Sequence, residues 1–247
     1  MNLCPPCARL GAVETSECLA LDALENSPPA VWLVLTTRLA ESSPAPFYRA
    51  RAAVMRAVKR RWPEAEYAAL VEFTTGYGPR SGGRRRPHWN LLLKNVPADA
   101  IEELREVVVR VWCDRVDAKP AGQFVGPVAE AGGLMRYLAL HFQKESQAPP
   151  LGWKGHRFMH SRGYFAEGIT EVRKRAQAQL RYRREVWKLE NAAAAAGVEL
   201  LPYEVHDLVG ERIERNAALT WKLVQTAELS PAPPPSRHPD WSRLAAP

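Results

Sequence analysis

The chain of 247 residues is 46% hydrophobic and 25% charged, which is ordinary for a soluble globular protein with one substantial core and an accessory region. Its formal net charge of +7 at pH 7 favours a polyanionic partner, with nucleic acid as the first candidate and a solvated basic surface as the alternative. No stretch approaches the ~20 apolar residues of a membrane-spanning helix and no signal peptide is visible, so we expect a cytoplasmic protein without a membrane segment.

The N-terminal segment, residues 1–30, precedes the first strand pattern. Cys4 and Cys7 have the spacing of a zinc knuckle, and Cys18 would supply a third thiolate. No fourth ligand lies nearby, so a structural Zn²⁺ and a frayed tail with free thiols stay open as alternatives. Residues 11–30 also carry a short helical pattern, which a Ser-Pro-Pro sequence ends.

Strand and helix patterns alternate over the next hundred residues. Residues 31–37 form a continuous apolar run rich in β-branched and aromatic residues, as in a central strand buried on both faces. After it we expect a helix over 47–62, strands over 67–75 and 87–94, a helix over 97–113 and a short strand over 122–128. This order predicts an α+β fold, with a ferredoxin-like or RRM-like antiparallel sheet and helices on one face.

The two middle strands carry polar side chains inside otherwise apolar runs. Glu72 interrupts the first strand, and His88 and Asn90 interrupt the second. Because residues i and i+2 of a strand point to one face, His88 and Asn90 project together, and Glu72 reaches the same face if the strands are neighbours. A carboxylate, an imidazole nitrogen and an amide oxygen at one place suit Mg²⁺ or Mn²⁺.

Basic residues on both sides of these strands suggest a partner that carries phosphate. The loop between the strands contains four arginines, Arg80, Arg84, Arg85 and Arg86. A basic and aromatic segment over 153–165 adds Lys154, Arg157 and Arg162. Aromatic residues interleaved with cations can stack on unpaired bases while they bind phosphates, although a short hairpin that closes the sheet has the same composition.

A later helix carries Tyr137, His141 and Lys144 on one face. Such a tyrosine can attack phosphorus, because the imidazole can accept the phenolic proton and the ammonium can stabilise developing charge. Taken alone, a helical tyrosine is more often a core or surface aromatic residue.

Two further helices are expected over 170–195 and 203–228, where they can form a hairpin packed on the core or on another protomer. The remaining residues, 230–247, are rich in proline and predict a disordered end. We therefore expect a catalytic or binding domain over 31–168, followed by a C-terminal helical region over 169–229.

Together these features resemble the rolling-circle replication initiators of the HUH endonuclease superfamily, in particular those of bacterial plasmids and single-stranded DNA phages. The resemblance covers about residues 31–165 and depends on Glu72, on the stretch Pro-His-Trp-Asn-Leu-Leu-Leu that contains His88, and on Tyr137 with Lys144. It implies a metal-dependent nicking enzyme of prokaryotic cytoplasm that acts on single-stranded origin DNA, with a host helicase as a further partner.

The resemblance also implies roles for individual residues. Glu72, His88 and Asn90 would hold Mg²⁺ or Mn²⁺. Tyr137 would attack the DNA backbone and leave a 5′-phosphotyrosyl link with a free 3′-hydroxyl, while His141 or Lys144 manages the proton or the developing charge.

Two positions depart from the family pattern. Asn90 stands where the family has its second histidine, and His141 stands where members with two tyrosines carry the second one. We therefore expect one nucleophile, and a non-catalytic single-stranded nucleic-acid-binding module stays open as an alternative, as does a structural protein with a zinc-bound N-terminus.

Overall fold

The computed structural model describes residues 5–38, 44–75, 85–143, 153, 156–202 and 204–214. Contacts divide the chain into two compact units, Met1–Leu180 and Arg181–Pro247. The first unit contains the sheet and the predicted site residues. The second contains the end of a long helix and a shorter helix that packs against it.

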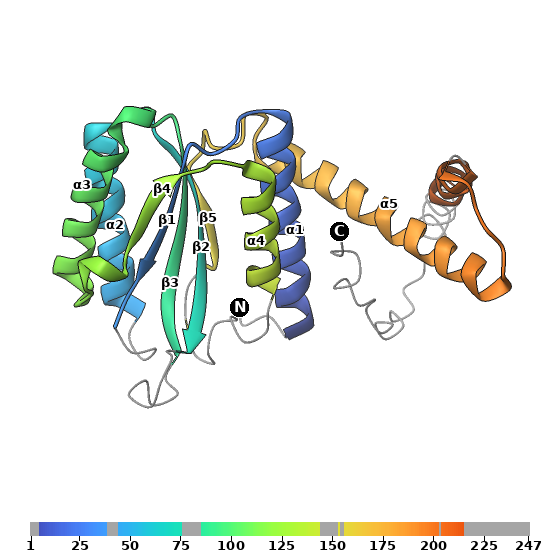
Figure 1. Ribbon diagram of the computed structural model, residues 1–247, viewed down its shortest axis with the longest axis horizontal. Helices are drawn as coiled ribbons and strands as arrows, with labels where there is room; N and C mark the ends of the chain where they lie inside the picture. The colour runs from blue at the N-terminus through green and yellow to red at the C-terminus, as the bar shows by residue number, and fades with distance from the viewer. Residues whose placement is uncertain are drawn as a thin grey trace, which may run out of the picture. The chain divides into compact units, whose positions relative to one another are not determined.

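A five-stranded antiparallel sheet is the centre of the first unit (Figure 1). Its strands are β1 (Val31–Thr36), β2 (Glu66–Thr75), β3 (Arg85–Lys94), β4 (Phe124–Pro127) and β5 (Phe158–His160). They lie in the order β4-β1-β3-β2-β5, and each neighbouring pair is antiparallel. The predicted α+β class and ferredoxin-like sheet are therefore confirmed, and β5 is added at the outer edge of β2.

Helices lie on both faces of this sheet. They are α1 (Pro5–Glu25), α2 (Pro44–Arg61), α3 (Ile101–Val116) and α4 (Ala131–Gln143), followed by α5 (Ile169–Ala196), with 3₁₀ turns at Ala98–Ala100 and Pro120–Gly122. The pair α2 and α3 covers one face, as predicted (Figure 1). The pair α1 and α4 lies on the other face, so the unit has three layers (Figure 1).

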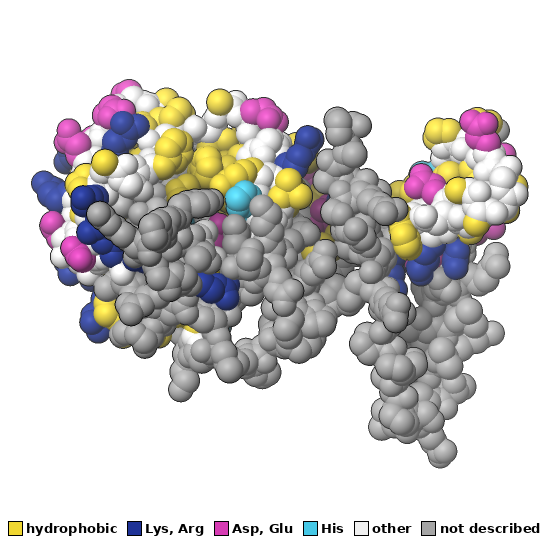
Figure 2. Space-filling view, turned by 60° about the horizontal axis from the view of Figure 1, so that its bottom comes forward, with side chains coloured by type: hydrophobic (Ala, Val, Ile, Leu, Met, Phe, Trp, Pro, Cys, Tyr) yellow, Lys and Arg dark blue, Asp and Glu magenta, His cyan; other side chains and the backbone are white. Residues whose placement is uncertain are grey.

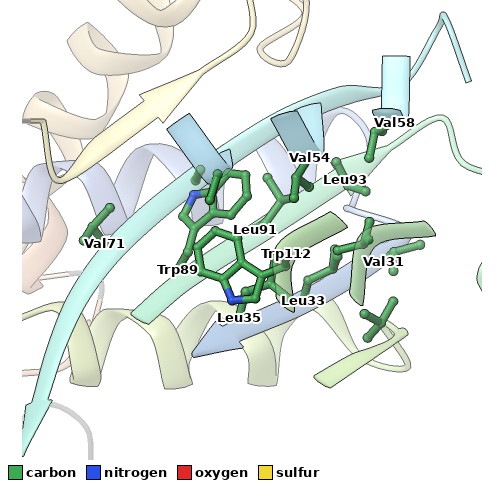
Figure 3. Close-up of a cluster of buried hydrophobic side chains, with 14 of the residues drawn as sticks. Val31, Leu33, Leu35, Val54, Val58, Val71, Trp89, Leu91, Leu93 and Trp112 are labelled. Atoms are coloured by element: carbon green, nitrogen blue, oxygen red, sulfur yellow. The ribbon is translucent and has the colours of Figure 1, made fainter. Parts of the chain in front are cut away.

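The main core lies between the sheet and the α2/α3 pair. Strand alternation sends Val31, Leu33 and Leu35 into it, and all three are fully buried. The rings of Trp89 and Trp112 stack in its middle, with their centres 5.8 Å apart (Figure 3). The periodic apolar stripes of α2 and α3 bury against these strands, and this burial is the main force that holds the layers together.

The opposite face of β1 differs from the prediction of a strand buried on both sides. Trp32, Val34 and Thr36 alternate with the fully buried residues and are only half-buried. The α1/α4 pair therefore leaves part of this sheet face open to solvent.

The helix α1 is longer than the pattern over 11–30 predicted, because it begins at Pro5. Its residues Ala12, Cys18 and Leu19 bury against the α4 side of the sheet, so the N-terminal segment belongs to the sheet unit. Its buried residues include small alanines, which give little periodic hydrophobic signal.

The helix α5 ends as predicted at Gly197, whose φ of +68° is the left-handed conformation that glycine adopts after a helix. In the second unit, residues 204–214 form the predicted next helix, and Val205 and Val209 are buried there. Its Arg212 contacts the buried carboxylate of Glu185 on α5. The rest of the predicted helix and the proline-rich end lie outside the described residues.

Within the described part of the chain, no helix combines the length and apolar character needed to cross a membrane.

Candidate functional site

Three predicted ligand side chains share the sheet face that α1 and α4 partly cover. Glu72 on β2 lies directly opposite His88 on β3, and Asn90 follows two residues along β3. Their neighbours Leu70 and Leu92 belong to the core cluster on this face, which confirms the direction of the alternation. Glu72 is 5% exposed and Asn90 is 2% exposed, whereas His88 is half-buried.

His88 is held in a form that can donate an electron pair. Thr74 Oγ1 lies 2.8 Å from His88 Nε2. Burial, with a smaller effect from Arg86, lowers the pKa of the imidazole to about 4, so the ring is neutral at pH 7. A neutral imidazole is the state that binds a metal ion.

Positive charge approaches the carboxylate of Glu72 from the neighbouring segment. Burial lowers the pKa of the Arg157 guanidinium to about 10, the carboxylate of Glu72 opposes this shift, and Arg85 adds to it. Arg157 Nε also donates to the carbonyl oxygen of Val71 at 3.4 Å. One predicted DNA-binding arginine, Arg157, therefore interacts electrostatically with the predicted metal ligand Glu72.

The helix α4 brings Tyr137 over the same face. Leu134 and Leu138, one turn apart, bury against the sheet and orient the helix. The Tyr137 ring then packs edge-on against Trp32 of β1 at 5.5 Å and lies 4.1 Å from the ring of His141. Tyr137 stays 43% exposed.

Trp32 links the tyrosine to the ligand group. Its Nε1 donates a hydrogen bond to Asn90 Oδ1 at 3.4 Å, while its ring packs on Tyr137. The sequence predicts Trp32 only as part of a buried strand, because a continuous apolar run does not show which residues face a partly open side. The structure thus adds Trp32 and Thr74 to the residues of the site.

The donor set fits a hard divalent cation in type. Glu72 supplies a carboxylate, His88 a neutral imidazole and Asn90 an amide oxygen. Arg157 competes with such a cation for the charge of Glu72. Among the described residues, no group of three His, Cys, Asp or Glu side chains lies close enough together to hold a metal ion. Asn90 is not one of these four residue types, so this result does not count its amide oxygen.

The cysteines offer less support for zinc. Cys18 is 1% exposed and packed in an apolar cluster, where burial, followed by Glu14, raises the pKa of its thiol to about 11. A protonated thiol is a poor zinc ligand. Cys4 and the side chain of Cys7 lie outside the described part of the structure.

The remaining predicted DNA-binding residues differ in exposure and in the packing of their side chains. Arg86 is half-buried at the start of β3, and Arg162 is exposed. Arg85 lies with its guanidinium over the Phe73 ring at 5.9 Å, and Phe73 belongs to the core on the opposite face. The other four predicted residues fall outside the described residues: Arg80, Arg84, Lys144 and Lys154.

Figure 2 shows hydrophobic side chains gathered on the sheet unit, with a histidine beside them and lysine and arginine side chains nearby. Comparison with protein-family models, with curated proteins and with solved structures gives no significant match, so any assignment of function depends on the geometry of this face.

Proposed function

We propose that the protein nicks single-stranded DNA through Tyr137, as an initiator of rolling-circle replication of the HUH endonuclease type, and rejoins the ends. The supporting observation is that a tyrosine on α4 and a Glu-His-Asn set on β2 and β3 occupy one sheet face, joined through Trp32. The expected setting is the cytoplasm of a prokaryote, with a plasmid or phage origin as substrate and a host helicase as partner.

In this proposal the phenolic oxygen of Tyr137 attacks a backbone phosphorus. The new bond joins Tyr137 to phosphorus, and the bond from phosphorus to the 3′-oxygen breaks. His141, whose ring lies 4.1 Å from the Tyr137 ring, accepts the phenolic proton, and the departing 3′-oxygen gains a proton to become a free hydroxyl.

Glu72, His88 and Asn90 would hold Mg²⁺ or Mn²⁺ beside the scissile phosphate. The bound cation would supply positive charge that stabilises the negative charge of the phosphoryl oxygens in the transition state. Arg86, Arg157 and Arg162 would contact neighbouring phosphates. Such contacts set the position of the strand without selecting its sequence.

The test is the formation of a covalent protein–DNA adduct. The full chain is incubated with a labelled library of single-stranded oligonucleotides and Mn²⁺ or Mg²⁺, and adducts that resist SDS are counted on a gel. We expect adducts with the unmodified chain and none with Tyr137→Phe. A matched control is Tyr67→Phe, which removes the same hydroxyl from the opposite face of the sheet and keeps adduct formation.

One result separates this proposal from its main alternative. The neutral amide of Asn90 and the charge of Arg157 near Glu72 favour a weak metal site, which a non-catalytic binding module would tolerate. DNA binding without any adduct, over both metals and the whole library, would support the binding module and refute nicking. Absence of both binding and adduct would refute both functions.

A further inference from the structure

Large aromatic side chains form a row on the open part of the sheet face. Phe124 on the edge strand β4 is 46% exposed, and Tyr137 on α4 is 43% exposed. The half-buried Trp32 ring lies between them, with centres 5.1 Å from Phe124 and 5.5 Å from Tyr137. We name Phe124, Trp32 and Tyr137 the aromatic row.

The backbone around Phe124 is built to keep its ring along the sheet. Gly126 lies two residues on, on the same face, and pairs with Trp32 across the ladder. A Cβ atom at Gly126 would approach Phe124 Cζ to 2.8 Å, so a larger residue would displace the ring. Glycine at this position therefore lets the phenyl ring lie over the strand beside the indole.

We infer that the aromatic row binds an unpaired nucleobase of a single nucleic-acid strand by stacking. This inference rests on the proposed function and deepens it, because the row ends at Tyr137, the residue that would attack the backbone. A base on Phe124 and Trp32 fixes the adjoining phosphate near the phenol. Stacking tolerates any base, since every base has an aromatic face.

The charge of the protein favours a nucleic-acid strand as the ligand of the aromatic row. The chain carries a net charge of +7, Arg136 is exposed next to Tyr137, and Arg86 lies two residues before His88. Aromatic surface on a basic unit suits a ligand that alternates flat rings with phosphates. An apolar protein partner would gain nothing from these charges.

The test measures the affinity of the full chain for a fluorescent oligothymidylate of about 16 nucleotides, by anisotropy. All variants are made in the Tyr137→Phe background, which keeps the ring and prevents covalent trapping. We expect Phe124→Ala to weaken binding about tenfold and Phe124→Leu to weaken it nearly as much, whereas Phe124→Trp keeps the affinity. Leu140→Ala is the control, because it removes a 46% exposed apolar side chain from the same region without removing a ring.

A second measurement locates the stacked base. Single abasic sites are moved along the oligonucleotide, and one position should cost about tenfold in affinity with Phe124 present and almost nothing with Phe124→Ala. Equal affinities of Phe124→Ala and Leu140→Ala would overturn the inference, as would a change in oligomeric state with unchanged DNA affinity. These affinities are measured with Tyr137→Phe variants, which cannot nick DNA. The adduct assay on the chain with Tyr137 intact therefore tests the proposed function separately.

Discussion

The half-buried imidazole of His88 makes the stability of the fold depend on pH. His88, on β3, is hydrogen-bonded to Thr74 of β2, and its partner in the strand register is Glu72. Burial and Arg86 lower its pKa to about 4, well below the value of about 6.5 in an unfolded chain.

Replacement of His88 by glutamine should remove part of this acid sensitivity. Between about pH 6.5 and pH 4, His88 is protonated in the unfolded chain and stays neutral in the folded chain. The free energy of unfolding therefore falls as the pH falls. The imidazole accounts for about 2 to 3 kcal/mol of this loss. Urea unfolding at pH 7 and pH 4.5 should therefore show a smaller decrease for His88→Gln than for the unmodified chain.

The matched control is His206→Gln, which removes an exposed imidazole from the second unit and should leave the decrease unchanged. An identical decrease for all three proteins would contradict a lowered pKa of His88 in the folded chain.

At the scale of elements, a buried ion pair attaches α1 to the sheet. Lys94 Nζ, on β3, lies 2.5 Å from Asp22 Oδ2 and donates to the carbonyl oxygen of Tyr164 at 3.0 Å. Both side chains are almost fully buried. Each charge is therefore stable in this place only because the other is present.

Truncation of Asp22 to alanine should lower the free energy of unfolding by about 3 to 5 kcal/mol, because the ammonium of Lys94 stays buried without its partner. Glu25→Ala on the same helix breaks a solvent-exposed pair with Arg175 and should cost less than about 1 kcal/mol. Urea unfolding curves measure both changes. Equal costs would show that the buried pair does not hold α1.

Most elements of the sheet unit were predicted from the sequence, and the start of α1 was not. The helices α2 and α3 are confirmed because their apolar residues repeat with a helical period, and the strands β1 to β4 are confirmed at the predicted positions. The predicted start of α1 was wrong, since alanine contributes little to a periodic apolar pattern. The ion pair of Asp22 with Lys94 was also not predicted, because it joins residues far apart in the sequence.

The candidate site shows a similar division. Strand alternation correctly placed His88 beside Asn90, and helical spacing correctly placed Tyr137 beside His141. The hydrogen bond from Trp32 to Asn90 joins β1 to β3, and the contact of Trp32 with Tyr137 depends on how α4 packs on the sheet. Contacts between residues this far apart in the sequence leave no local signal.

At the scale of the whole molecule, the two units divide inside one helix. The domain predicted from the sequence ends at residue 168, whereas the contacts divide the chain between Leu180 and Arg181, within α5. The first part of α5 buries Val172 and Ala176 in the cluster that also contains α1 and α4. The later part packs against residues 204–214 through Glu185 and Arg212.

A chain cut after Leu180 should therefore fold on its own, because it keeps the buried residues of the sheet unit. We expect its free energy of unfolding to change by less than about 1 kcal/mol. If the proposed nicking occurs, the cut chain should still form the DNA adduct, since the described site residues lie before the cut. A chain cut after Gly168 loses Val172 and Ala176, so it should be less stable by about 2 to 4 kcal/mol. Urea unfolding of the two truncated chains tests whether the sheet unit ends at residue 168 or at Leu180. Equal stability of the two chains would mean that the first part of α5 contributes nothing to the sheet unit.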